Sequence, residues 1–336
     1  MLKRLNSPGN YPILREARLA QFQPPFLAQL GIFVLIFISS QVVQGIATAL
    51  AMLPSLLQTI IPQINAGGAE IDISPEKLLD TMGDGITLVM LFSTVIIILF
   101  TFIYCRKIEK RSYFSMGFSK TNFATQYLAG LLAGAALFAV TVLICMPFGA
   151  VRFEAVSNIP AQYILLFFVA FLIQGMSEEV MCRGYFMVSL SNRSSVILAV
   201  LANSLVFSLL HIVNANVTFL ALCNIFLFGV FASVYMLFFN NIWGICALHA
   251  AWNFVQGNIF GSNVSGMALE SRVWTMFPAE KYELLTGGAF GIEGGLAMTI
   301  VLGVSIAIFT YLLIKRVSRQ TPEDGSAVLA AQPEEG

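Results

Sequence analysis

Three ionisable side chains lie close together beside an apolar segment of the chain. Glu178, Glu179 and Arg183 fall within the stretch from Gly175 to Gly184, which follows an uninterrupted apolar run from Tyr163 to Ile173. An ionised side chain at membrane depth costs at least about 2.5 kcal/mol on insertion scales. Because inserting this cluster costs free energy, its presence indicates a structural or a chemical role.

Helical spacing divides the tasks of these three residues. Residues four apart share one face of a helix, whereas adjacent residues point in directions about 100° apart. Glu179 and Arg183 are therefore predicted to form an ion pair, while Glu178 points to another face. There, Glu178 is free to face a wet cavity and to serve as a general base. The alternative role for the cluster is a salt bridge that locks two helices together.

The only two histidines, His211 and His249, belong to later apolar segments. If the chain turns back near residues 192–195 as a helical hairpin, Glu178 and His211 each lie about 25 Å along their helices from that turn. A carboxylate and an imidazole at one depth suit an acid/base pair. The alternative for His211 is an interfacial histidine at a helix end.

His249 and Asn253 are four residues apart and so share one face of their segment. Two hydrogen-bond donors on one face suit an anion that develops during a reaction, as in an oxyanion hole. An imidazole is also a common zinc ligand. The alternative is interhelical hydrogen bonding, which polar side chains often provide inside membranes.

The composition of the chain is typical of an integral membrane protein. Of its 336 residues, 57% are hydrophobic and 11% are charged, whereas soluble domains carry about 25% charged residues. The formal net charge is zero, so no global field favours nucleic acid as a partner. Apolar windows of about 20 residues predict an all-α, multi-pass bundle of about eight transmembrane helices. Their approximate ranges are 27–53 (ended by Pro54), 86–105, 126–146, 161 onward, 195–211, 217–239, 242–260 and 291–314.

The same patterns predict how the chain is organised around the membrane. Residues 1–26 form a polar N-terminal segment, residues 27–314 form the bundle, and residues 315–336 form a disordered tail. Basic clusters at Arg106–Arg111 and Lys315–Arg316 predict that both termini are cytoplasmic. The short loops favour a bacterial plasma membrane. An acidic loop follows the first helix and contains Glu70, Asp72, Glu76, Asp80 and Asp84.

Small residues add three further expectations. Gly130 and Gly134 have the spacing that permits close contact between two membrane helices. The five cysteines lie in or beside apolar segments, which predicts small buried side chains and no disulfide framework. The glycines that flank Glu293, from Gly287 to Gly295, could let a loop approach the site closely, but a flexible turn is favoured.

Together the polar motifs resemble those of the CPBP family of intramembrane proteases. That family includes the CAAX-type prenyl-protein endopeptidases and bacterial proteins once grouped with bacteriocin immunity. The resemblance covers a core of about residues 160–260. It rests on Glu-Glu-x-x-x-Arg at 178–183, Phe-x-x-x-His at 207–211 and His-x-x-x-Asn at 249–253.

The resemblance implies hydrolysis of peptide bonds in membrane-associated protein or peptide substrates. It implies that Glu178 together with His211 activates water. It also implies that His249 and Asn253 stabilise the oxyanion. The residues with an organising role would be Glu179, Arg183 and Phe207.

Members of this family have been described both as metalloproteases and as glutamic proteases. If zinc were bound, its ligands would be Glu178, His211 and His249. The sequence contains no His-Glu-x-x-His helix, and the amide of Asn253 is an unusual zinc ligand. A metal-independent glutamic mechanism is therefore favoured over a zinc mechanism, and no cofactor is expected.

Two further functions compete with proteolysis. A non-catalytic membrane scaffold or an immunity-type protein would use the same polar cluster to hold its helices or to bind a partner. A proton-coupled carrier would use Glu178 and His211 as relay groups, but the sequence lacks the inverted repeat that is common in such carriers. In each case membrane lipid surrounds the protein.

Overall fold

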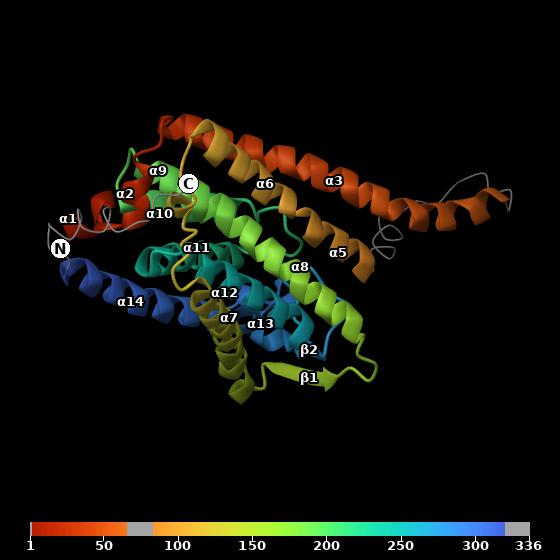
Figure 1. Cartoon of the computed structure of the whole chain (residues 1–336). Helices are drawn as coiled ribbons and strands as arrows, with labels where there is room; N and C mark the ends of the chain where they lie inside the picture. The colour runs from red at the N-terminus through yellow and green to blue at the C-terminus, as the bar shows by residue number, and fades with distance from the viewer. Residues whose placement is uncertain (1, 66–82, 320–336) are drawn as a thin grey trace.

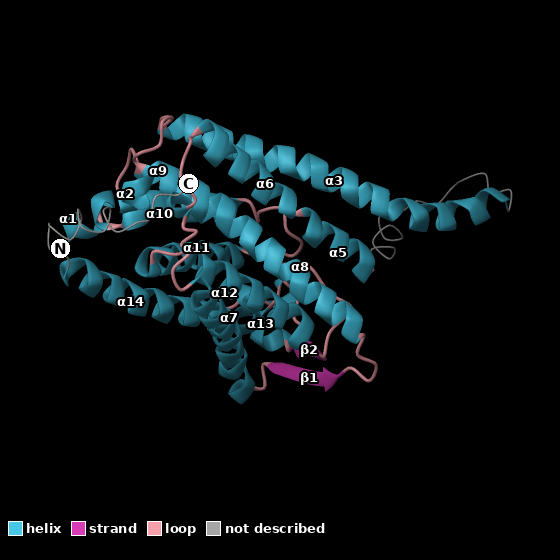
Figure 2. Ribbon diagram, in the orientation of Figure 1, coloured by secondary structure: helices cyan, strands magenta, loops and turns pink. Residues whose placement is uncertain are grey.

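Helices dominate the computed structural model, which describes residues 2–65 and 83–319 (Figures 1 and 2). The first half contains α1 (Leu2–Leu5), α2 (Pro12–Ala17), α3 (Phe26–Asn65), α5 (Asp84–Ser93), α6 (Val95–Ile103), α7 (Phe123–Cys145) and α8 (Ala161–Glu179). The second half contains α9 (Val188–Ser191), α10 (Val196–Leu209), α11 (Phe219–Phe239), α12 (Trp243–Phe254), α13 (Glu283–Thr286) and α14 (Leu296–Arg319).

Six helical stretches among the described residues are long and apolar enough to cross a membrane. They are Phe26–Asn65, Asp84–Ile108, Phe123–Phe148, Ala161–Ser191, Phe219–Phe239 and Leu296–Arg319. The other two predicted segments are also helical, but α10 has 14 residues and α12 has 12. The predicted all-α, multi-pass bundle is thus confirmed, while the number of membrane crossings stays a prediction.

The two ends of the described chain lie at the same end of the bundle. The Arg4 guanidinium donates a hydrogen bond to the carbonyl oxygen of Ser318 over 3.4 Å. The N-terminal segment also accepts a hydrogen bond from Asn192, in the turn that follows α9, through the carbonyl oxygen of Ala17 at 3.1 Å. This arrangement is what an even number of crossings produces.

Helix α12 is held tightly between α7 and α8. A Cβ atom at Gly130 would lie 2.1 Å from the carbonyl oxygen of Gly244, and one at Gly134 would lie 2.2 Å from that of Leu248. On the other side, a Cβ atom at Gly175 would lie 2.8 Å from the backbone nitrogen of Ala250. Three glycines therefore let three backbones approach each other closely, and the predicted contact at Gly130 and Gly134 is confirmed.

The predicted end of the first helix at Pro54 is wrong. Helix α3 runs for 40 residues and contains both Pro54 and Pro62. A proline removes one backbone hydrogen bond, which membrane helices tolerate when local adjustments satisfy the freed group. Figure 1 shows the far end of α3 projecting beyond the neighbouring helices.

A small sheet that the sequence did not predict lies at the opposite end of the bundle. Strand β1 (Val151–Ala155) pairs with β2 (Trp274–Pro278) in antiparallel fashion, with Val151 opposite Pro278 and Ala155 opposite Trp274. The two strands come from loops far apart in the sequence. Pairing of this kind leaves no local turn signal.

Arg111, the last residue of the basic cluster that was used to orient the chain, lies inside the protein. Its side chain is fully buried and lies 3.2 Å from the buried carboxylate of Glu109. It also donates hydrogen bonds to the hydroxyl of Ser189 at 2.9 Å and to the carbonyl oxygen of Gly184 at 2.9 Å. A neutralised pair of this kind joins the segment after α6 to the chain that follows α8.

The other sequence predictions at the chain ends and loops are only partly covered. The disordered tail was predicted for residues 315–336, but α14 continues to Arg319, and residues 320–336 lie outside the described residues. Asp84 begins α5, and the remaining acidic positions, Glu70, Asp72, Glu76 and Asp80, also lie outside them. The cysteines are all free, and four of the five are buried, as predicted.

The close contact between α7 and α12 generates a test of packing. Gly134→Val should lower the free energy of unfolding by about 1–3 kcal/mol, because the larger side chain overpacks the contact. The matched control is Gly303→Val in α14, where a Cβ atom would meet nothing within 4 Å. Thermal unfolding in detergent measures both. Equal unfolding temperatures for the two variants would contradict the described packing.

Candidate active site

The paired glutamates stand where α8 changes its helical form. Glu178 and Glu179 are the last residues of α8, and the chain continues as a π-helix from Val180 to Met187. Such wider turns occur frequently at functional sites. Arg183 lies inside this segment, and every side chain from Val180 to Met187 is buried.

Glu179 forms the structural centre of the cluster. Its Oε1 atom accepts a hydrogen bond from Arg183 over 3.0 Å, and both side chains are fully buried. The same oxygen lies 2.9 Å from Nδ1 of His249. The predicted Glu179–Arg183 pair is therefore confirmed, and it extends across to α12 through His249.

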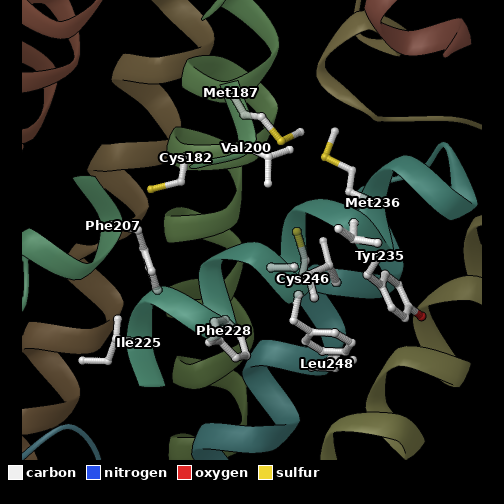
Figure 3. Packing of buried hydrophobic residues seen from close by; sticks show 14 of the residues in the cluster. Cys182, Met187, Val200, Phe207, Ile225, Phe228, Tyr235, Met236, Cys246 and Leu248 are labelled. Atoms are coloured by element: carbon white, nitrogen blue, oxygen red, sulfur yellow. The ribbon is translucent and has the colours of Figure 1, made fainter. Parts of the chain in front are cut away.

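The Arg183 guanidinium also contacts an aromatic ring. It stacks over Phe207 of α10, with 4.4 Å between the guanidinium carbon and the ring centroid. Among the described residues, its Nε and Nη2 atoms have no hydrogen-bond partner. The ring face therefore supplies attraction where hydrogen bonds are missing. Figure 3 shows Phe207 in the packed cluster that also contains Phe228.

Glu178 has a different environment from its neighbour. Its side chain is 24% exposed, whereas that of Glu179 is fully buried. Glu178 accepts a hydrogen bond from Gln174 over 2.7 Å, and its Oε2 atom lies 3.7 Å from Nε2 of His249. Glu178 is thus the accessible carboxylate of the two, as its helical position predicted.

His249 lies between the two carboxylates. Its Nδ1 atom is 2.9 Å from Oε1 of Glu179, and its Nε2 atom is 3.7 Å from Oε2 of Glu178. When both ring nitrogens carry hydrogen, the ring can donate at both positions.

His211 is positioned to accept a proton. It follows the end of α10, and its Nδ1 atom lies 2.9 Å from the carbonyl oxygen of Phe207. Since a carbonyl oxygen only accepts, Nδ1 carries the hydrogen in this contact. In the neutral ring Nε2 then keeps its lone pair and is available as a proton acceptor. Phe207 therefore fixes His211 through its backbone and Arg183 through its ring.

Gln174 links the first and third motifs, a role that sequence reasoning did not assign to it. Its Oε1 atom accepts a hydrogen bond from Nδ2 of Asn253 over 2.9 Å, while its own amide donates to Glu178. Only one of the two hydrogens on Nδ2 of Asn253 is used in this contact. The signal in the sequence was the position of Gln174, one helical turn before Glu178.

All four residues predicted to be catalytic line one cavity of about 680 Å³. Glu178 comes from α8, His211 from the turn after α10, and His249 and Asn253 from α12. The opposite walls belong to α3, α5 and the loop at 264–270. Within the described part of the chain, no hydrogen bond joins Glu178 to His211, so the cavity and not a direct contact brings them together.

The predicted flexible turn around Glu293 is a close-packed loop. A Cβ atom at Gly291, where φ is +114°, would lie 2.0 Å from the carbonyl oxygen of Asn263. Glu293 accepts hydrogen bonds from the backbone and hydroxyl of Ser265 at 2.6 and 2.8 Å. It also lines a smaller cavity together with both histidines. Sequence reasoning gave close approach of this loop as the less favoured alternative and assigned no role to Glu293.

The possible zinc ligands Glu178, His211 and His249 line the same cavity. Within residues 2–65 and 83–319, no three His, Cys, Asp or Glu side chains converge on a point where a metal could be held. The candidate ligands Glu178 and His249 instead face each other, and Nδ1 of His249 is engaged by Glu179.

The fold and the cavity define a polytopic membrane protein with a polar site enclosed by helices. Residues 160–255 match the family described as Type II CAAX prenyl endopeptidase Rce1-like. This match confirms the resemblance that the three motifs predicted, and it indicates an intramembrane protease of the CAAX type. Comparisons with curated proteins and with solved structures find no match.

The buried ion pair generates a test of stability. Arg183→Leu should lower the free energy of unfolding by about 3–5 kcal/mol, because it leaves Glu179 buried without its cation. Arg152→Leu is the matched control, since that arginine is 67% exposed and pairs with Glu154 at the surface. Thermal unfolding of the two purified variants compares them. A smaller loss for Arg183→Leu than for the control would contradict the pairing.

Proposed function

We propose that the chain is an intramembrane endopeptidase of glutamic type. The observation that carries the proposal is the convergence of Glu178, His211, His249 and Asn253 on one cavity of about 680 Å³. This volume is within the range of about 300–1,000 Å³ that is usual for ligand sites. Its substrates are peptides or proteins that lie in or on the membrane.

The first chemical step is the attack of water on the scissile carbonyl. The accessible carboxylate of Glu178 and the free Nε2 atom of His211 act on this water, and one of them takes its proton. The water oxygen then bonds to the carbonyl carbon, and the carbonyl electron pair moves onto oxygen. General-base assistance of this kind contributes about 10²- to 10⁴-fold to a rate.

The second step is the collapse of the tetrahedral intermediate. His249 and the unused amide hydrogen of Asn253 are donors on one face of α12, and they stabilise the negative oxygen. The carbon–nitrogen bond then breaks, and the proton taken from water passes to the leaving amine. The products are a carboxylate and an amine, so no external oxidant or cofactor is consumed.

Glu179, Arg183 and Phe207 have an organising role in this scheme. Glu179 holds Nδ1 of His249, which directs Nε2 toward the cavity. Arg183 neutralises Glu179 and is itself covered by Phe207. The three motifs are therefore joined by contacts as well as by a common cavity.

We also propose an orientation for the protein in the membrane. We place both termini on the cytoplasmic side of a plasma membrane, the arrangement expected for basic residues at chain ends. The contact between Arg4 and Ser318 supports a common side for both ends. The bacterial origin of that membrane rests on the short loops of the sequence alone.

A non-catalytic scaffold or immunity function is the second candidate. The contacts from Glu179 to Arg183 and His249 favour it, because they tie α8 to α12 without any need for chemistry. That role depends on Glu179 and makes no use of the exposed carboxylate of Glu178. Substitution of Glu178 therefore separates the two functions.

Removal of the proposed base should abolish cleavage and preserve the fold. We expect Glu178→Gln to lower kcat by at least about a hundredfold, since the amide keeps the side-chain size but cannot take a proton. Glu154→Gln, at a surface position, is the matched control. Purified protein in lipid vesicles is incubated with a peptide library, and mass spectrometry counts the products. Full activity of Glu178→Gln would exclude the proposed mechanism.

Chelation should leave peptidase activity unchanged. The mechanism uses only carboxylate, imidazole and amide groups, so prolonged dialysis against EDTA should not alter kcat. A zinc peptidase dialysed in parallel serves as the positive control. If the activity disappears on dialysis and returns with added zinc, the glutamic mechanism is wrong and the reaction depends on a metal ion.

A further inference from the structure

A second, smaller cavity lies directly behind the proposed catalytic residues. Its volume is about 40 Å³, and we call it the side chamber. Phe207, both histidines, Asn253 and Ser265 line this chamber and the large cavity alike. The side chamber is thus an extension of the site on the side of α11 and α14.

The wall that belongs only to the side chamber combines polar and apolar groups. Glu293 and Asn224 contribute the polar part, while Ile225, Met298 and Leu302 are among its apolar residues. The amide of Asn224 is already committed, because Nδ2 donates to the carbonyl oxygens of Glu293 and Gly295 at 2.8 and 2.9 Å. The Glu293 carboxylate is therefore the main polar group that this wall offers to a small molecule.

Glu293 is held firmly in this place. Its Oε1 atom accepts both hydrogen bonds from Ser265, and the adjoining loop is fixed by the hydrogen bond from Gly266 to the carbonyl oxygen of Phe290 at 2.9 Å. Ser265 itself has a positive φ of 50°, a conformation that costs energy in a residue other than glycine. The loop thus holds a strained residue and a carboxylate against the site.

The size and chemistry of the side chamber suit water. To hold one water molecule, a polar cavity needs at least about 10–15 Å³ of space that the centre of a water molecule can occupy. It also needs two to four polar partners. Glu293 and the free Nε2 atom of His211 provide two such partners, and Asn253 adds an amide. A bound peptide would fill the large cavity, so the second reactant must be kept elsewhere.

We propose that the side chamber stores the water consumed in the reaction and that Glu293 positions it beside His211. This inference rests on the proposed function, because only hydrolysis consumes water at this site. Glu293 acts through the water and touches no peptide atom, so it is a positioning residue. It lies outside the three motifs and outside the matched segment 160–255.

The electrostatics of Glu293 agree with this task. Burial raises the pKa of its carboxyl above the usual range, whereas the hydrogen bonds from Ser265 and the nearby His211 lower it. The net upward direction favours the protonated carboxyl relative to a carboxyl in water. A carboxyl can donate a hydrogen bond to water when it is protonated and accept one when it is ionised.

Two independent variants test the side chamber. Leu302→Phe fills it from the apolar side without touching Glu293, and Glu293→Leu removes its polar group. Each should lower kcat by about tenfold, the effect of losing a well-positioned water, and leave KM unchanged. Glu293→Gln should recover most of the activity, since its amide can still hold water and accept from Ser265. Val304→Phe, at an exposed position of α14, is the matched control.

The outcomes separate this inference from the proposed function. Full kcat in both Leu302→Phe and Glu293→Leu, or a rise in KM alone, would overturn the water chamber while the loss of activity in Glu178→Gln still stands. If neither variant folds, high-resolution cryo-electron microscopy of the wild-type protein decides the question. Water density between Glu293 and His211 supports the inference, and a dry chamber overturns it. That measurement requires no peptidase activity, so it tests the water site separately from the reaction, while Glu178→Gln tests the reaction itself.

Discussion

The burial of charge where α8 meets α12 is the constraint on which the rest of the site depends. Glu179 and Arg183 are fully buried, and the loss of either partner would leave an uncompensated charge inside the bundle. Close approach of the helices makes the pairing with His249 possible, because Gly175 brings the backbone of α8 against Ala250. A site of this kind cannot be loosened without destabilising the bundle.

This constraint assigns different tasks to two chemically identical neighbours. Glu179 is fully buried, and its Oε1 atom is held by Arg183 and His249, so its side chain is not part of the lining of the large cavity. Glu178 keeps one side open to the large cavity. The two histidines also have different partners. A carboxylate orients His249, whereas a backbone carbonyl oxygen orients His211. Position, and not residue type, separates structural from chemical roles.

Sequence reasoning was most successful where helical spacing decides the outcome. The Glu179–Arg183 pair and the contact at Gly130 and Gly134 follow from residues four apart on one helix. It made no prediction of the pairing of β1 with β2 or of the burial of Arg111, and it favoured a flexible turn over a close approach of the Glu293 loop. All three features depend on long-range packing. The helix through Pro54 was missed because proline is a weaker stop signal inside a membrane than in water.

The central claim is that Glu178 and His211 face the attacking water while His249 and Asn253 face the oxyanion. A structure with a bound peptide aldehyde tests it directly, because the hydrated aldehyde carries two oxygens on a tetrahedral carbon. We expect one oxygen within hydrogen-bond distance of Glu178 and His211, and the other within reach of Nε2 of His249 and Nδ2 of Asn253. Binding of the tetrahedral carbon outside the large cavity, or contact with Glu179 in place of Glu178, would contradict the account.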